Sequence, residues 1–199
     1  MHRIKLLLVT ALIFAFRVSV AQKMETGVNL GIADASIRGG DAGLKKSLLG
    51  YNAGVYLEQY VLDNLGFNSA VQFIEKGLKG SSLEAANYSA KLDFIQYAFT
   101  TKIYIDEGTK NKLVVGLGFY CGILHRKKIT ADPNFSFEYD YFPFDAGISG
   151  LLGVKIDKYV ALLIQAQMGP SAVVSGTESG GHHVYVGLNL SAPLFSFNK

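Results

Sequence analysis

Short segments in which apolar and polar residues alternate recur along this chain of 199 residues. In one of them, Phe67, Val71 and Phe73 fall on one parity. Asn68 and Gln72 fall on the other. A period of two is typical of strands, because successive side chains of a strand point to opposite faces of the sheet. The pattern predicts eight strands, at residues 25–33, 51–61, 65–75, 91–105, 112–124, 142–156, 159–169 and 183–195.

The predicted connections alternate in length. An even number of strands with short turns at one end and long loops at the other is typical of outer-membrane barrels. We therefore predict an all-β fold, an eight-stranded antiparallel up-and-down transmembrane β-barrel. The long polar connections are residues 34–50, 76–90, 125–141 and 170–182, and the short turns are residues 62–64, 106–111 and 157–158.

The fourth predicted strand is irregular. Leu92 and Phe94 share the parity of the polar residues Gln96, Thr100 and Lys102. This arrangement predicts either a β-bulge near Phe94 or a later start of the strand.

The first 21 residues have the pattern of a secretory signal peptide. Arg3 and Lys5 precede an apolar run at residues 6–16, and residues 19–21 (Ser-Val-Ala) match a small-x-small cleavage site. A run of about 11 residues is too short to cross a bilayer core of about 30 Å as a helix. We assign residues 1–21 to a cleaved signal peptide and residues 22–199 to one barrel domain.

Charge and cysteine content exclude two other classes of protein. The chain has 19 Lys and Arg against 16 Asp and Glu, and the predicted signal peptide holds three of the basic residues and none of the acidic ones. The predicted mature chain is therefore balanced, without the positive surplus that a nucleic-acid partner requires. Cys121 is the one cysteine, so no internal disulfide holds the fold.

The parity pattern alone leaves two barrels open, because a soluble lipocalin-like barrel also alternates. Two features favour an apolar face that meets lipid and a location in the outer membrane. The polar parity is rich in Gly, Asn, Gln, Ser and Tyr rather than in Lys and Glu. Aromatic residues lie toward the ends of several apolar faces, as in the girdles of membrane barrels: Tyr51, Phe67, Phe73, Phe119, Phe142 and Phe144.

Several stretches in order resemble the PorT-like outer-membrane β-barrel proteins of Bacteroidota, Gram-negative bacteria in which such chains are described as porin family proteins. They are "GVNLGIA", "YNAGVYLEQYVLDNLGFNSAVQFIEKG", "KLDFIQYAFTTKIYI" and "LVVGLGFYCGIL". The resemblance implies a barrel of the OmpA/OmpX-like type with a structural, interaction or secretion-associated role. The chain departs from it at the last strand, where Pro193 interrupts "LNLSAPLFSFNK".

The stretch "LVVGLGFYCGIL" holds three glycines and the cysteine. Its GxGxxxG spacing and the lack of a following helix exclude a dinucleotide-binding loop. Gly116, Gly118 and Gly122 share the parity of Tyr120, so we expect them in a lumen where large side chains of other strands must fit. Cys121 has the opposite parity and is expected to face lipid as a small apolar residue.

The polar residues of the inner parity form the main candidate site. In a narrow lumen, charges must be paired, so we expect Glu58 and Asp145 to be balanced by Lys102 and Lys155. Eight strands leave little room, which favours a polar plug over the alternative of a narrow solute pore. The candidate lumen residues are Glu58, Gln72, Gln96, Lys102, Asp145, Lys155, Gln165 and Gln167, with Tyr56, Tyr60, Tyr104, Tyr120 and Tyr185 as further filling.

A basic run begins the third long connection. His125, Arg126, Lys127 and Lys128 are expected at the outer rim, where they can bind lipopolysaccharide phosphates. The aromatic residues that follow at 135–141 can contact a protein partner. The alternative is a solvated loop.

No cofactor, metal or catalytic residue is predicted. His182 and His183 are adjacent in a strand and point to opposite faces, and no third ligand is evident. Two other functions stay open. A lipid-modifying hydrolase or acyltransferase on the same barrel would recruit His125, Ser136 and Glu138. A soluble periplasmic ligand-binding barrel would have the reverse polarity.

Overall fold

The structure is a computed structural model of the whole chain. It describes residues 23–38, 45–81, 87–106, 108, 110–131, 140–141, 143–157, 159–169, 174–175 and 182–198. The predicted signal peptide lies outside the described residues. No helix among the residues described is long and apolar enough to cross a membrane.

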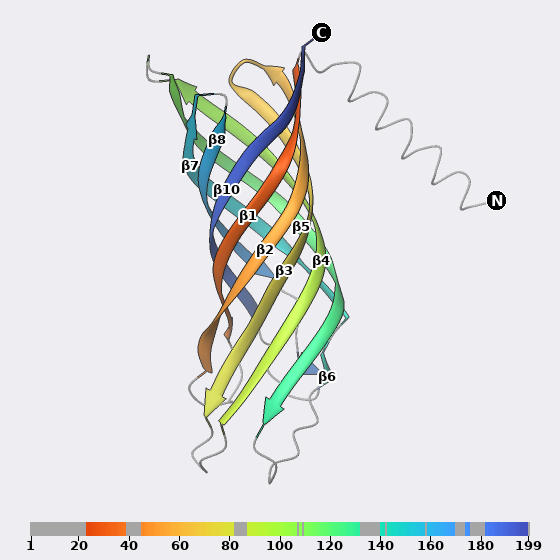
Figure 1. The fold of residues 1–199 in the computed structure, drawn as a ribbon. Coiled ribbons are helices and arrows are strands. Elements are labelled where there is room, and N and C mark those ends of the chain that lie inside the picture. Colours follow the sequence, from red (N-terminus) through yellow and green to blue (C-terminus); the bar gives the residue numbers. More distant parts are fainter. Residues whose placement is uncertain are drawn as a thin grey trace, which may run out of the picture.

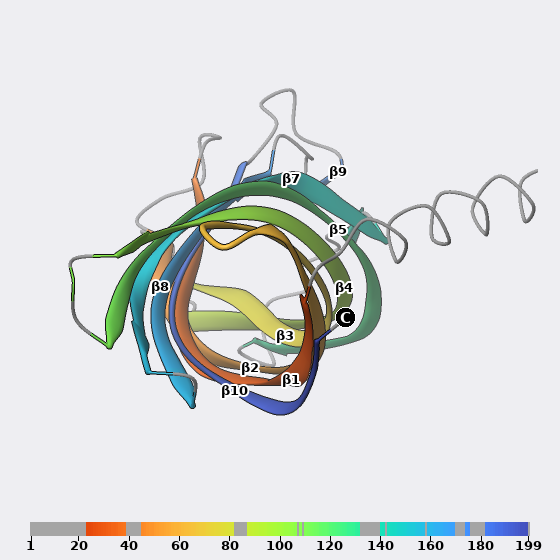
Figure 2. The same ribbon diagram turned by 90° about the horizontal axis from the view of Figure 1, so that it is seen from above.

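Eight long strands close into one antiparallel barrel, in the order β1-β10-β8-β7-β5-β4-β3-β2. Figure 2 shows the closed ring in a view along the barrel. The predicted fold class is confirmed. The strands are β1 (Lys23–Arg38), β2 (Lys45–Leu62), β3 (Leu65–Ser81), β4 (Asn87–Asp106), β5 (Asn111–Ala131), β7 (Phe144–Ile156), β8 (Val160–Gly169) and β10 (His182–Asn198). The two-residue strands β6 (Asp140–Tyr141) and β9 (Val174–Ser175) pair with each other outside the barrel sheet.

The barrel has a turn end and a loop end. The turn end carries the first residue of β1, the last of β10 and the three short connections, β2 to β3, β4 to β5 and β7 to β8. In one of these connections Gly108 has a φ of 75° and its N–H donates to Asp106 Oδ1 at 2.9 Å. At the loop end, β3, β4 and β5 reach furthest from the C terminus (Figure 1).

The strands are longer at the loop end than the pattern predicts. β3 continues to Ser81, β4 begins at Asn87 and β5 continues to Ala131. The prediction of a loop from residue 125 is therefore wrong for residues 125–131. The apolar outer face ends before the backbone pairing does, because the outward residues become polar, as at Lys91 and Asp93, whereas Ala90 and Leu92 stay buried on the inner parity.

The predicted irregularity near Phe94 is a bulge on the neighbouring strand. Asp93 pairs with Arg126 and Phe94 with Leu124, which leaves His125 of β5 as the extra residue. β4 itself keeps one parity inward, and Phe94 is 2% exposed. The bulge changes the register between β4 and β5 by one residue for the part of β5 beyond His125.

Apolar side chains cover the outside of the barrel. Leu117 is 73% exposed and Ile148 is 69% exposed. The inner face carries most of the buried polar groups instead. Exposed large apolar residues occur on every long strand, among them Leu30, Val55, Val71, Ile95, Leu117, Phe119, Ile148, Leu152, Ile164, Leu188 and Leu190.

Pro193 lies at a β-bulge in the strand that closes the barrel. Gly27 of β1 pairs with Pro193 and Thr26 pairs with Phe195, so Leu194 is the extra residue. Proline lacks an N–H and is tolerated in sheets at such bulges. The interruption expected from the sequence is therefore local, and β10 continues to Asn198.

The three glycines of β5 differ in how closely a neighbouring strand approaches them. A Cβ on Gly118 would overlap the carbonyl oxygen of Phe99 and lie 2.7 Å from the Cα of Thr100. At Gly122 the nearest atom, the carbonyl oxygen of Ile95, would be 3.4 Å away, which is an ordinary contact. The constraint at Gly118 is backbone proximity rather than the large side chains expected from the sequence.

We predict that Gly118→Ala destabilises the barrel and that Gly122→Ala does not. The alanine at 118 forces β4 and β5 apart, at a cost of about 1–3 kcal/mol. Urea titration in detergent micelles, followed by far-UV circular dichroism, measures the difference. Equal stability of the two variants would show that β4 moves away without cost.

Candidate functional site

All eight candidate lumen residues point to the inside of the barrel. Seven of them are less than 9% exposed, and the side chain of Lys155 is 12% exposed near the turn end. The five tyrosines assigned to the lumen are also buried. The period-two parity therefore places these side chains correctly, although it says nothing about their partners.

Besides Lys23, which pairs with Glu25 Oε1 at the turn end, three lysines form ion pairs inside the lumen in the described part of the chain. Lys102 Nζ lies 2.9 Å from Glu58 Oε2, as expected. Asp145 Oδ2 pairs with Lys76 Nζ at 2.7 Å, so its predicted balance by Lys102 or Lys155 is wrong. Lys155 Nζ instead lies 2.7 Å from Glu25 Oε2. Each buried carboxylate thus has a cation, as charges in a low-dielectric interior require.

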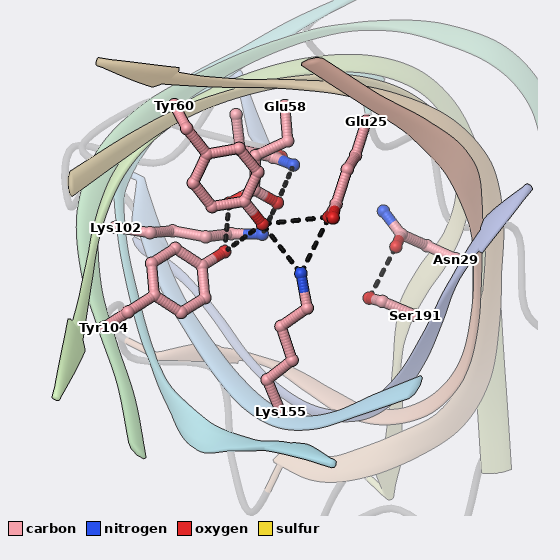
Figure 3. A network of polar contacts seen from close by, with 9 residues as sticks. Glu25, Asn29, Glu58, Tyr60, Lys102, Tyr104, Lys155 and Ser191 are labelled. Carbon is pink, nitrogen blue, oxygen red and sulfur yellow. Dashed lines mark hydrogen bonds and ion pairs between the residues drawn. The ribbon is translucent and has the colours of Figure 1, made fainter. Parts of the chain in front are cut away.

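Six side chains close the lumen near the turn end, and we call them the turn-end cluster (Figure 3). Lys155 Nζ donates to Glu25 and to the Tyr60 hydroxyl, each at 2.7 Å, and Tyr60 donates to Glu25 Oε2 at 2.9 Å. Tyr104 donates to Glu58 Oε1. The cluster comprises Glu25, Glu58, Tyr60, Lys102, Tyr104 and Lys155, from four strands.

A second group, the loop-end cluster, surrounds Lys76. The ammonium group lies 4.4 Å from the ring centre of Tyr120, 5.6 Å from that of Phe94 and 5.9 Å from that of Tyr185. Aromatic faces attract a desolvated cation. Together with Asp145, these rings hold a lysine that is 1% exposed. We define the loop-end cluster as Lys76, Phe94, Tyr120, Asp145 and Tyr185.

Amide side chains occupy the lumen between the two clusters. Asn52 Nδ2 donates to Tyr185 at 2.6 Å and to Asn189 Oδ1 at 2.7 Å. Asn189 Nδ2 donates in turn to Gln165 Oε1 at 3.0 Å. These bonds connect the loop-end cluster to the middle of the barrel. The amide band comprises Asn29, Asn52, Asn68, Gln72, Gln96, Gln165, Gln167 and Asn189, all buried.

Two charged lumen residues, Lys76 and Glu25, are not among those predicted from the sequence. Lys76 follows the predicted third strand, which ends at residue 75, yet it shares the inner parity of Gln72. Glu25 is the first residue of the predicted first strand and has the parity of Asn29. Both residues follow from the inner parity if the third strand is extended by one residue and the first residue of the first strand is included.

The basic run lies on β5 rather than in a loop. His125, Arg126, Lys127 and Lys128 are all exposed. On the adjacent strand, Lys91 stands directly opposite Lys128. We call Lys91, Arg126 and Lys128 the basic rim.

Two largely buried acidic residues of the outward parity, Glu75 and Asp93, lie close to the basic rim. Lys91 Nζ pairs with Glu75 Oε1 at 2.9 Å. Arg126 Nε lies 3.9 Å from Asp93 Oδ2.

Cys121 and the potential metal ligands are the remaining candidates for chemistry. Cys121 is a free thiol, partly exposed on the outer side. No group of three His, Cys, Asp or Glu side chains in the described part of the chain is arranged to hold a metal ion. Ser136 and Glu138, which the hydrolase alternative requires beside His125, lie outside the described residues, as do residues 135–139 of the predicted aromatic contact surface.

No protein-family model matches the chain, and neither does a curated protein sequence. Among solved structures, the outer-membrane protein OprG of Pseudomonas aeruginosa is similar over 90% of this chain and 97% of its own, with 13% identity and a TM-score of 0.54. This likeness shows the fold of eight-stranded outer-membrane barrels. Ail of Yersinia pestis (87% and 98% coverage, 11% identity, TM-score 0.45) and Neisserial surface protein A (84% and 96%, 13%, 0.46) also match.

We predict that Asp145→Ala destabilises the barrel strongly. The change leaves Lys76 buried without its carboxylate, a loss of about 3–5 kcal/mol in the free energy of unfolding. Lys112→Ala is the matched control, because Lys112 is partly exposed and lies 3.5 Å from Asp106 at the turn end, where a surface pair contributes about 0–1 kcal/mol. Urea titration of both variants tests this, and an unchanged Asp145→Ala barrel would mean that Lys76 finds another partner.

Proposed function

We propose that the protein is an integral barrel of the bacterial outer membrane. The observation that carries this proposal is the polarity of the wall, with apolar side chains exposed outside and ion pairs and amides buried inside. Soluble proteins rarely expose apolar patches larger than a few hundred Å². Lipid in contrast requires an apolar exterior and a sheet without free edges.

The two ends support one orientation. In outer-membrane barrels the short turns face the periplasm and the longer connections face outward. The turn end would therefore lie in the periplasm, which agrees with export through the predicted signal peptide. The loop end, with the outer parts of β3, β4 and β5, would stand outside the bilayer.

The role that fits this arrangement is non-enzymatic. The ion-paired, tyrosine-filled lumen is closed at rest, so we place the function at the loop end, as a structural or interaction surface. The motif resemblance to PorT-like proteins supports a secretion-associated task in Bacteroidota. A lipid-modifying enzyme would need a base, a nucleophile and an acid at one rim, and the described residues supply only His125 of that set.

Membrane fractionation tests the proposal. We expect the protein to stay with outer membranes in alkaline carbonate and to migrate faster on a gel before heating than after, because a hydrogen-bonded barrel resists detergent unfolding. Alanine substitution of His125 should leave the lipid composition of the membrane unchanged. Release into carbonate without a mobility shift would instead favour the soluble periplasmic barrel.

We also propose lipopolysaccharide as a ligand of the basic rim. The rim lies just beyond Ile95 and Ile123, which among the residues of described exposure are the exposed apolar residues of β4 and β5 nearest the loop end. Phosphate groups of the outer leaflet would meet its cations at this level. Each basic side chain near an anionic membrane surface contributes about 1 kcal/mol.

Substitution of two rim residues measures this contribution. The Arg126→Gln, Lys128→Gln double variant should bind lipopolysaccharide about 30-fold more weakly in detergent. Lys112→Gln at the turn end removes a lysine far from the rim and is the control. Equal binding by all three proteins would contradict the assignment of the rim.

A further inference from the structure

Seven buried polar atoms of the inner face have no hydrogen-bond partner within the described protein. They belong to side chains that are at least nine-tenths buried; Gln96 is 1% exposed and Gln167 is 3% exposed. An unsatisfied buried polar atom costs about 1–3 kcal/mol, so these atoms require partners other than protein. The atoms are Asn52 Oδ1, Gln72 Oε1, both amide atoms of Gln96, Ser149 Oγ and both amide atoms of Gln167.

These atoms lie between the two clusters. On β3, Gln72 stands between Asn68, which donates to Glu58, and Lys76. On β4, Gln96 stands between Phe94 and Lys102. Water is a ligand that can satisfy both donors and acceptors in a narrow polar space.

Three cavities continue from the amide band to the turn end. The first, of about 30 Å³, is lined by Asn68, Gln72, Gln165 and Lys102 among others. Lys102 also lines the second, of about 10 Å³, which in turn shares Tyr104 and Lys155 with the third. The third is an open vestibule of about 480 Å³ at the turn end. Side chains of the turn-end cluster thus line the places where neighbouring cavities meet.

We propose that the lumen is a hydrated path for small monovalent ions, closed at rest by the lysines of the two clusters in series. The proposal goes beyond a surface role of the loop end, but it rests on the barrel spanning a bilayer. A lysine side chain has four rotatable bonds, so it can leave its partner without a change in the barrel wall. The two closures therefore open through side-chain motion.

The closures differ in strength. Lys155 is partly exposed beside the vestibule, and if it swings out, Glu25 keeps Lys23 at 2.7 Å as a counter-charge. Lys76 is fully enclosed by Asp145 and three rings, so its departure would break a buried ion pair and three contacts with aromatic faces at once. The loop-end cluster therefore limits the open fraction of the path.

Conductance in planar bilayers tests the path. The Lys76→Met, Asp145→Asn double variant removes both charges at nearly constant volume. A minor state is typically populated at about 0.1–10%, and the double variant should raise the open fraction at least about tenfold, out of that range. Lys155→Met alone should change it less than about twofold, because the other closure still limits. Asp34→Asn, which removes an exposed charge on the outer face of β1, should have no effect.

Failure of the ion path can be distinguished from failure of the barrel to insert into the membrane. Heat-dependent gel mobility of the reconstituted proteins shows whether each variant is folded in the bilayer. A folded double variant without conductance above that of lipid would overturn the ion path. Hydroxyl-radical labelling of the wild-type barrel gives a second readout, because water beside Asn52 should lead to oxidation of Tyr185 although it is 1% exposed. An unlabelled Tyr185 would overturn the hydrated band.

Discussion

The pairing of β1 with β10 closes the sheet, and most other properties of the molecule depend on that closure. The pairing runs from Lys23 opposite Asn198 to Arg38 opposite His182, with one bulge beside Pro193. A closed sheet has no free edge, so the backbone groups of the wall bond to neighbouring strands. The outer face is then free to be apolar, and polarity collects inside.

Closure with eight strands also fixes a narrow interior. Where two strands approach closely, as at Gly118, even a methyl group meets backbone atoms. Long side chains that enter the lumen must find partners within it, which explains why each lysine there contacts a carboxylate and an aromatic ring. The same side chains fill the lumen and balance its charge, so closure of the path and stability of the barrel have one physical origin.

The sequence predicts the eight strands and the face of the sheet that each side chain occupies, because the period of two holds wherever one face is apolar. It could not supply the pairing of Asp145 with Lys76, since residues 69 positions apart meet only through the stagger of nonadjacent strands. The sequence pattern also predicts too early an end for β5. Beyond Ile123 the alternation stops, whereas the pairing with β4 continues to Ala131 past the bulge at His125.

The central claim is that the apolar face meets lipid and the polar face does not, and Cys121 allows a direct measurement. It is the one cysteine of the chain and lies on the outer parity of β5, opposite Tyr97 and Ala146. A nitroxide attached to it in lipid vesicles should be relaxed strongly by oxygen, which concentrates in the bilayer, and weakly by a water-soluble nickel complex. Strong relaxation by the nickel complex in the folded barrel would place this face in water and contradict the account.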